Sequence, residues 1–231
     1  MRTTSFTNPP VEIGAKDPVC TTPSGGTPDG RSPGYVLYPN EGPALWFHEA
    51  LFSVKARSVD TEGQFSLFDQ VAPKGFAAPP HFHSAVTDSF YIVDGELDYA
   101  VGDTVYYGVT SGGFIYIPHS TRHEFRVVSE TAHFLLLCTP GGFEGYFEDL
   151  GSPAQEFDLP PTGHRHLLGS EVLAAKRKWG AMPTNDASLF CPLEDRAVLM
   201  EKQRTVRVES HSRPFSWVNT VSANGKELRP L

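Results

Sequence analysis

Between Phe65 and Pro140 the chain is a succession of short apolar runs that leave no room for a helix of ordinary length. Each run is rich in β-branched or aromatic residues and is bounded by glycine, proline, aspartate or serine, which is typical of consecutive antiparallel strands. The 21 glycines and 20 prolines punctuate these runs and do not gather into low-complexity tracts. We therefore expect an all-β protein whose neighbouring strands pair by hairpins and bury their inner faces in a sandwich or closed barrel.

The composition changes along the chain and divides it into three parts. Residues 1–34 are rich in Pro, Gly, Thr and Ser, a composition that cannot bury enough apolar surface to order itself, so we expect a flexible N-terminal arm. We expect residues 35–160 to form one β-barrel domain and residues 161–231 to form a C-terminal extension. The expected strands lie within residues 35–38, 44–56, 64–73, 88–102, 104–109, 113–118, 123–128 and 132–140.

The segments after the last barrel strand have weaker patterns. Residues 144–150 could make two helical turns, and residues 167–179 have a helical composition with basic residues in the last turn. Residues 205–210 alternate like a strand. The extension also contains apolar patches that need a surface to cover, so we expect it to pack on the barrel or on a second subunit of a homodimer.

Charge and cysteine content limit the class of partner and the compartment. A formal net charge of -8 argues against nucleic acid or an anionic membrane surface, because both need clustered Lys and Arg. A neutral or aromatic small molecule fits better. Without a signal-like segment or a long apolar span we expect a soluble, cytoplasmic protein. Cys20, Cys138 and Cys191 form an odd set without C-x-x-C spacing, so we expect reduced thiols.

One stretch, Gly75 to Gly95, carries potential metal ligands. Side chains of a strand repeat every two residues, so His81 and His83 should point to one side, and Asp88 lies where the next strand begins. Imidazole and carboxylate together suit divalent transition metals, and the spacing does not choose among Fe, Mn, Ni, Cu and Zn. A further histidine, His123, follows about forty residues later in a similar setting.

These two blocks resemble the two motifs of the cupin superfamily. The first motif is matched by Gly75, His81, His83, Asp88 and Gly95, and the second is matched by Gly112, Pro118 and His123. The resemblance implies a small double-stranded β-barrel of the jelly-roll type with one divalent metal in its mouth. It also implies that His81, His83 and His123 are metal ligands.

Asp88 occupies the place of the family's usual glutamate and is one methylene shorter. It could bind the metal directly if its strand lies further inward, bind through a water, or act as a catalytic base beside a three-histidine site. We expect His119 and Glu124, which flank the second motif, to be solvated.

A closer resemblance extends from about residue 35 to residue 160. The run TPGGFEGYFEDLGSPAQEFDLP is similar to the segment that follows the barrel in quercetinase-like cupins. It implies a metal-dependent dioxygenase that uses dioxygen and acts on an aromatic or enolic substrate such as a flavonoid or polyketide-like molecule. Residue parity predicts that Phe90, Ile92, Phe125 and Val127 face the barrel interior. The expected substrate pocket consists of Phe90, Ile92 and Phe125 together with Tyr116 and Phe134, and Phe65 and Leu67 are further neighbours.

Two other functions stay open at this point. One is a non-oxidative cupin enzyme of natural-product (secondary) metabolism, such as an isomerase, cyclase, dehydratase or decarboxylase. The other is a non-catalytic cupin that binds a small molecule.

Overall fold

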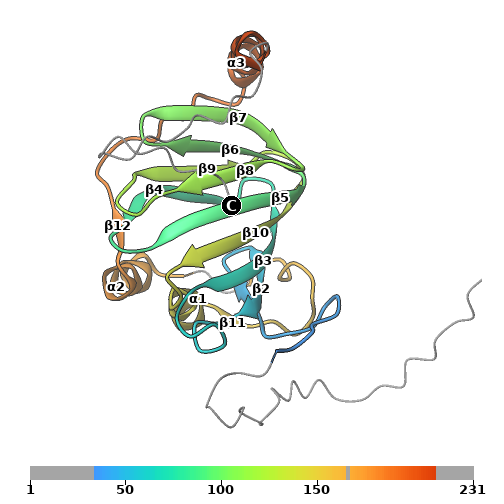
Figure 1. Ribbon diagram of the computed structural model, residues 1–231, viewed down its shortest axis with the longest axis vertical. Helices are drawn as coiled ribbons and strands as arrows, with labels where there is room; N and C mark the ends of the chain where they lie inside the picture. The colour runs from blue at the N-terminus through green and yellow to red at the C-terminus, as the bar shows by residue number, and fades with distance from the viewer. Residues whose placement is uncertain (1–33, 165–166, 212–231) are drawn as a thin grey trace, which may run out of the picture.

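A computed structural model of the protein describes residues 34–164 and 167–211. Two antiparallel sheets form a jelly-roll barrel (Figure 1), so the all-β prediction is confirmed. The larger sheet has the strand order β11-β1-β2-β3-β10-β5-β8, and the smaller sheet has the order β12-β4-β9-β6-β7. The strands of the larger sheet are β1 (Ala44–Phe47), β2 (Ala50–Ala56), β3 (Ser66–Pro73), β5 (Thr87–Asp94), β8 (Phe114–Ile117), β10 (Thr131–Thr139) and β11 (Ser152–Pro153).

The smaller sheet carries the strands around the histidines. Its members are β4 (Ala77–His83), β6 (Glu96–Val101), β7 (Thr104–Thr110), β9 (His123–Val127) and β12 (Ala181–Pro183). The helices are α1 (Glu144–Leu150), α2 (Gly169–Trp179) and α3 (Arg196–His211). The two helices expected at residues 144–150 and 167–179 are therefore present. No described helix combines the length and apolar character needed to cross a membrane.

Two predicted strands are wrong. Residues 35–38 form no strand, and the side chains of Val36 and Tyr38 are exposed. Residues 205–210 lie within α3. Upstream of them, Leu199, Met200 and Gln203 are partly buried and follow the spacing of one helical face. A six-residue alternating window was too short to reveal this longer period.

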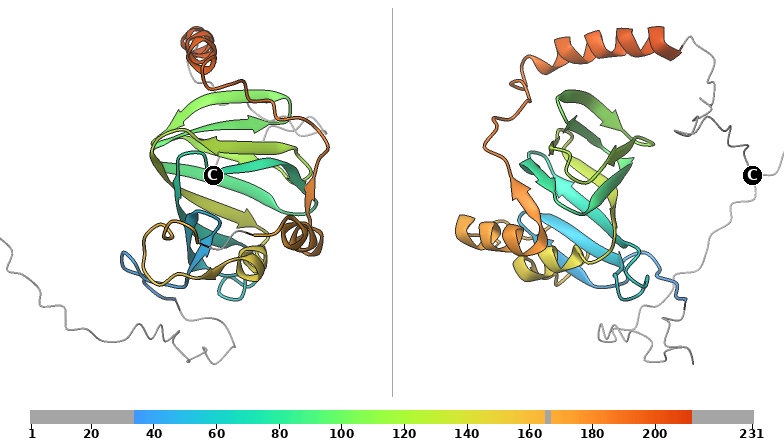
Figure 2. Two further views of the ribbon diagram at one scale, coloured as in Figure 1. Left: turned by 180° about the vertical axis from the view of Figure 1, so that it is seen from behind. Right: turned by 60° about the vertical axis from the view of Figure 1, so that its left-hand side comes forward.

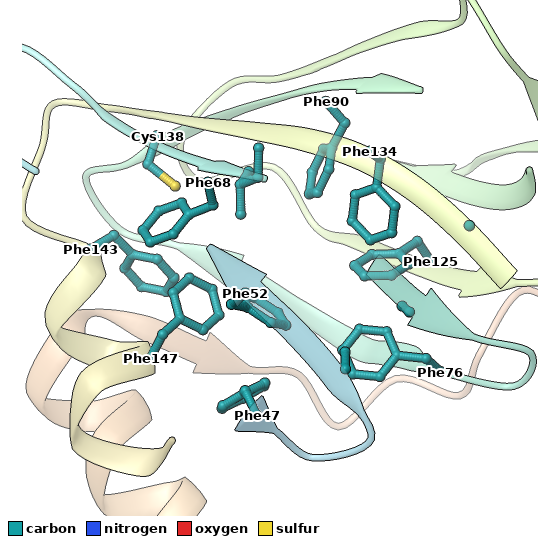
Figure 3. Close-up of a cluster of buried hydrophobic side chains, with 14 of the residues drawn as sticks. Phe47, Phe52, Phe68, Phe76, Phe90, Phe125, Phe134, Cys138, Phe143 and Phe147 are labelled. Atoms are coloured by element: carbon teal, nitrogen blue, oxygen red, sulfur yellow. The ribbon is translucent and has the colours of Figure 1, made fainter. Parts of the chain in front are cut away.

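The core lies between the inner faces of the two sheets. Ser66, Phe68, Gln70 and Ala72 are the buried positions of β3, and every second residue of β10 is buried in the same way. Phenylalanines from both sheets and from α1 meet in this space (Figure 3). The alternation that predicted the strands therefore also identifies the residues that fill the barrel.

The residues after α1 return to the barrel and cover part of it. β12 pairs with β4, and α2 contacts α1. The segment 184–195 then runs along the outside of the smaller sheet to α3, which lies beside β7 (Figure 2). The backbone N–H of Leu189 donates to Glu124 Oε1 at 2.8 Å, and Arg126 Nη1 donates to the Cys191 carbonyl at 3.1 Å. We call residues 184–195 the strap.

Candidate metal centre

Three histidines from two neighbouring strands converge at one end of the barrel interior. His81 and His83 lie at alternate positions of β4, and His81 is the register partner of His123 on β9. The three side chains each offer a nitrogen, and these nitrogens lie within 4.8 Å of one another. His83 and His123 are buried, and His81 is partly buried. The pairing of β4 with β9 therefore brings together the three histidines predicted as ligands.

Backbone carbonyls fix the ring orientation of two histidines. His81 Nδ1 lies 2.8 Å from the Pro79 carbonyl oxygen, and His123 Nδ1 lies 3.0 Å from the Thr121 carbonyl oxygen. A carbonyl oxygen only accepts, so in both rings Nδ1 carries the hydrogen and donates it. The lone pair of each neutral ring then lies on Nε2, which is the arrangement found in metal-binding histidines.

Asp88, near the start of β5, faces the same point. Its Oδ2 lies 3.1 Å from His83 Nε2 and 3.6 Å from His123 Nε2. The shorter aspartate side chain therefore reaches the histidine cluster.

The Asp88 carboxylate and the nearby imidazole nitrogens form a site that favours a bound cation. In the neutral tautomer set by Thr121, His123 Nε2 and the Asp88 carboxylate are both acceptors, and two facing acceptors need a proton or a metal ion between them. His83 Nδ1 is buried without a hydrogen-bond partner among the described residues. The donor set of imidazole nitrogens and one carboxylate fits a divalent transition metal.

The ionisation states also suit a metal centre. Burial raises the pKa of Asp88, but the neighbouring rings of His123 and His83 outweigh burial and hold this pKa below its usual range. Burial, followed by the charges of His123 and His83, lowers the pKa of His81 well below its usual value. A carboxylate and a neutral imidazole are the forms that coordinate metals.

Cys138 on β10 lies on the other side of the carboxylate. Its Sγ donates to Asp88 Oδ1 at 3.5 Å, and the residue is buried as a free cysteine. Burial and the neighbouring Asp88 charge raise the pKa of this thiol well above its ordinary value, so it keeps its hydrogen. Cys138 is therefore a reduced thiol, as expected, and it contacts the candidate site as well as filling the core.

A cavity of about 390 Å³ opens beside the histidines. This volume lies within the range of small-molecule sites. Phe90 and Phe125, both predicted for the pocket, line it. Six further aromatic residues line it, from β1, β2, α1 with its N-cap, and the turn before β4: Phe47, Phe52, Phe76, Phe143, Tyr146 and Phe147.

The other predicted pocket residues do not line this cavity. Ile92 and Phe134 are fully buried in the barrel core. Tyr116 is 59% exposed, because β8 turns Ile115 and Ile117 inward and leaves Tyr116 on the outer face. The prediction for Tyr116 is therefore wrong.

The sequence interpretation also missed two residues that line the cavity, Gln70 and Lys176. Phe65 and Leu67 were the predicted neighbours, but the inward positions of β3 are the alternate ones, which include Gln70. Gln70 is 2% exposed, lines the cavity, and its Nε2 has no hydrogen-bond partner among the described residues. A polar residue at an inward position of an alternating run was the available signal. Lys176 reaches the cavity from α2, for which no local signal exists.

The two residues that flank the second motif have different outcomes. His119 is exposed, as predicted. Glu124 is only 2% exposed, so the prediction that it is solvated is wrong. It accepts hydrogen bonds from Arg122 Nη2 at 3.1 Å and from the strap at Leu189 N. The strap covers the outer face of β9, which otherwise would face water.

Comparisons with known proteins agree with this architecture. Residues 68–139 match a family model described as "Cupin domain". Over 134 residues the chain is 31% identical to quercetin 2,3-dioxygenase of Bacillus subtilis (strain 168), in an alignment that covers 58% of this chain and 39% of that protein. The chain thus spans about two fifths of the length of this relative.

Solved structures that match part of the chain include two proteins of low sequence identity. Ectoine synthase from P. lautus is 17% identical with a TM-score of 0.43, covering 57% of this chain and 96% of that chain. A predicted oxalate decarboxylase from Thermotoga maritima is 12% identical with a TM-score of 0.42, covering 46% of this chain and 99% of that chain.

Proposed function

We propose that this protein, a quercetinase-like cupin, is a metal-dependent dioxygenase that acts on an aromatic or enolic small molecule. One observation carries the proposal: imidazole lone pairs and an ionised carboxylate face one another at the wall of a cavity lined by eight Phe and Tyr side chains. The similarity to quercetin 2,3-dioxygenase supports the choice of dioxygen as second substrate.

The residues that would hold the metal are His81, His83 and His123, with Asp88 beside them. A divalent transition metal bound there would act as a Lewis acid that lowers the pKa of an enolic or phenolic oxygen. The metal identity stays open among Fe, Mn, Ni, Cu and Zn.

The protein's own groups would orient the substrate and accept its proton. Asp88 Oδ2 faces the histidine nitrogens, so it would act as general base toward a hydroxyl placed at the same point. Gln70 Nε2 would donate a hydrogen bond to a substrate oxygen, because it lines the cavity with no other acceptor among the described residues. The aromatic walls exclude water, which strengthens both interactions.

The test uses quercetin as the probe. The full-length protein is loaded separately with Fe, Mn, Ni, Cu and Zn, and quercetin absorbance and dissolved oxygen are recorded together. We expect equimolar consumption of quercetin and oxygen with at least one metal. His81→Ala should lose bound metal and turnover, whereas His119→Ala, an exposed histidine outside the cluster, should keep both.

Other outcomes would point to the alternatives. Consumption of quercetin without oxygen would contradict the dioxygenase proposal and favour a non-oxidative enzyme. Metal binding without turnover of quercetin or of a panel of other phenolic and enolic molecules would favour a binding protein. The homodimer, the cytoplasmic location, a role in secondary metabolism and the domain limits at residues 35–160 stay predictions; the predicted arm lies almost entirely outside the described residues.

A further inference from the structure

One wall of the cavity is supplied by the segment that follows the barrel. Val172 and Lys176, one turn apart on α2, both line the cavity, as does Ala181 on β12. Lys176 lies outside residues 68–139, which match the cupin family model. The cavity therefore combines a barrel that carries the histidines with a helix that the family match does not include.

The position of α2 relative to the histidines is fixed by its C-terminal turn. Ala181 is the register partner of His83, and Ser84 N donates to the Gly180 carbonyl at 3.0 Å. Gly180 ends the helix with φ 73°, and a Cβ at this position would lie 2.7 Å from Ser84 Oγ. The left-handed φ favours glycine here, and the tight turn holds Lys176 beside β4.

Within residues 34–164 and 167–211, Lys176 has no partner for its charge. No hydrogen bond or ion pair joins its ammonium group to any described residue, including Glu49 and Asp88, the two carboxylates of the cavity wall. Every other partly buried lysine or arginine in the described part of the chain pairs with a carboxylate: Lys55, Arg57, Arg122, Arg126 and Arg196.

The environment of Lys176 agrees with a charge directed toward the site. Burial lowers the pKa of Lys176, and the lysine charge contributes to the low pKa of His81. A cation withdrawn from water needs an anionic partner, and the cavity is the place where one can enter.

We propose that Lys176 binds an acidic oxygen of the substrate, so that the preferred substrate is an aromatic or enolic molecule that also carries a carboxylate or an equally acidic hydroxyl. The inference rests on the proposed function, because it assumes that the substrate occupies the cavity beside the metal centre. Lys176 is then a specificity residue that distinguishes acidic substrates from neutral molecules of the same shape.

The test compares two probes that differ in charge and share one ring system, 1-naphthoate and 1-naphthamide. Binding to the zinc-loaded, full-length protein is measured by calorimetry, so no turnover is needed. We expect the wild type to prefer the anion. Lys176→Met should weaken naphthoate binding about tenfold and change naphthamide binding by less than about twofold.

Two further variants control for fold and for net charge. Lys176→Arg should keep the preference for naphthoate, since it retains the cation. Arg177→Met removes the same charge from the next, exposed residue of α2 and should leave both affinities unchanged.

Three results would overturn the inference. They are equal binding of the two probes by the wild type, unchanged naphthoate binding by Lys176→Met, and an equal loss for both probes, which would indicate a packing role. The proposed function fails on different evidence, namely the quercetin and oxygen measurements, so the two failures can be told apart.

Discussion

At the scale of single residues, Asp88 is subject to two opposing effects. Its burial favours the neutral acid, whereas the imidazoles of His83 and His123 favour the carboxylate and dominate. Cys138 donates to the other oxygen, so the two oxygens of one carboxyl group have different partners. This asymmetry leaves Oδ2 as the atom that faces the cavity side of the site and can accept a proton.

Replacing Asp88 separates a role in metal binding from a role in proton transfer. We expect Asp88→Asn to retain metal on three imidazoles and to lower turnover about 10²–10⁴-fold, because an amide cannot act as the base. Elemental analysis and steady-state kinetics with quercetin check the two parts. Asp103→Asn, in an exposed turn, is the control. A variant that is purified without metal would instead assign Asp88 as an essential ligand.

At the scale of secondary structure, Glu144 connects α1 to the barrel. Its carboxylate accepts hydrogen bonds from the backbone and hydroxyl of Ser58, from the Ser66 hydroxyl on β3, and from Gly142 N. The cavity-lining residues Tyr146 and Phe147 lie on the same short helix, and Phe143, which also lines the cavity, is its N-cap. Glu144 therefore sets the position of a whole wall of the site without contacting the cavity.

The carboxylate of Glu144 gives a pH-dependent contribution to stability. Burial raises its pKa, but the hydrogen bonds from Ser58 and Ser66 outweigh burial, so the net pKa is lowered. The stabilisation is present above the unfolded-state pKa, which is 4.5, and is lost as pH falls through the lower folded-state pKa. Glu144→Gln should lower the free energy of unfolding by about 1–3 kcal/mol at pH 7.

Urea unfolding at several pH values checks this prediction. The difference between the wild type and Glu144→Gln should be largest at pH 7 and should shrink below pH 4.5. Glu148→Gln, which removes a solvent-exposed ion pair with Arg57 from the same helix, should change stability little. A difference that is independent of pH would show that the charge of Glu144 is not the stabilising feature.

At the scale of the whole molecule, a buried ion-pair cluster joins the strap and α3 to the barrel. Asp98 on β6 is fully buried and accepts hydrogen bonds from Arg126 Nε at 3.0 Å and from Arg196 Nε at 2.9 Å. Arg196 begins α3, and Gln203 on that helix accepts a hydrogen bond from Tyr107 N on β7 at 3.0 Å. Strand β9 and the start of α3 thus meet at one carboxylate of β6.

Neutralising Asp98 should remove the carboxylate partner of Arg126 and leave Arg196 paired with Glu96 alone. We expect Asp98→Asn to lower the free energy of unfolding by about 3–5 kcal/mol and to release the strap. Chemical unfolding and the rate of tryptic cleavage near Arg196 measure the two effects. Glu201→Gln, on the exposed face of α3, should leave both at wild-type values. Unchanged tryptic cleavage of Asp98→Asn would show that other contacts hold the strap.

The sequence alone predicted most of the barrel strands, from the alternation of apolar residues, and the histidine cluster, from the spacing of two motifs. His81, His83 and His123 could be identified because their spacing matches the two cupin motifs. Lys176 could not, because its contact with the cavity depends on the pairing of Ala181 with His83, almost one hundred residues apart in the chain. Glu124 was misjudged for a related reason, since alternation describes the two faces of a strand but not what covers the outer one.

The pairing of β12 with β4 has a consequence for the solution behaviour of the protein. β4 would otherwise be an edge strand with a row of unpaired backbone N–H and C=O groups, and such edges recruit strands from other molecules. Residues Ala181–Pro183 occupy this edge and end in a proline, which has no N–H to offer a further strand. β12, which contributes Ala181 to the cavity wall, therefore also protects β4 from pairing with strands of other molecules.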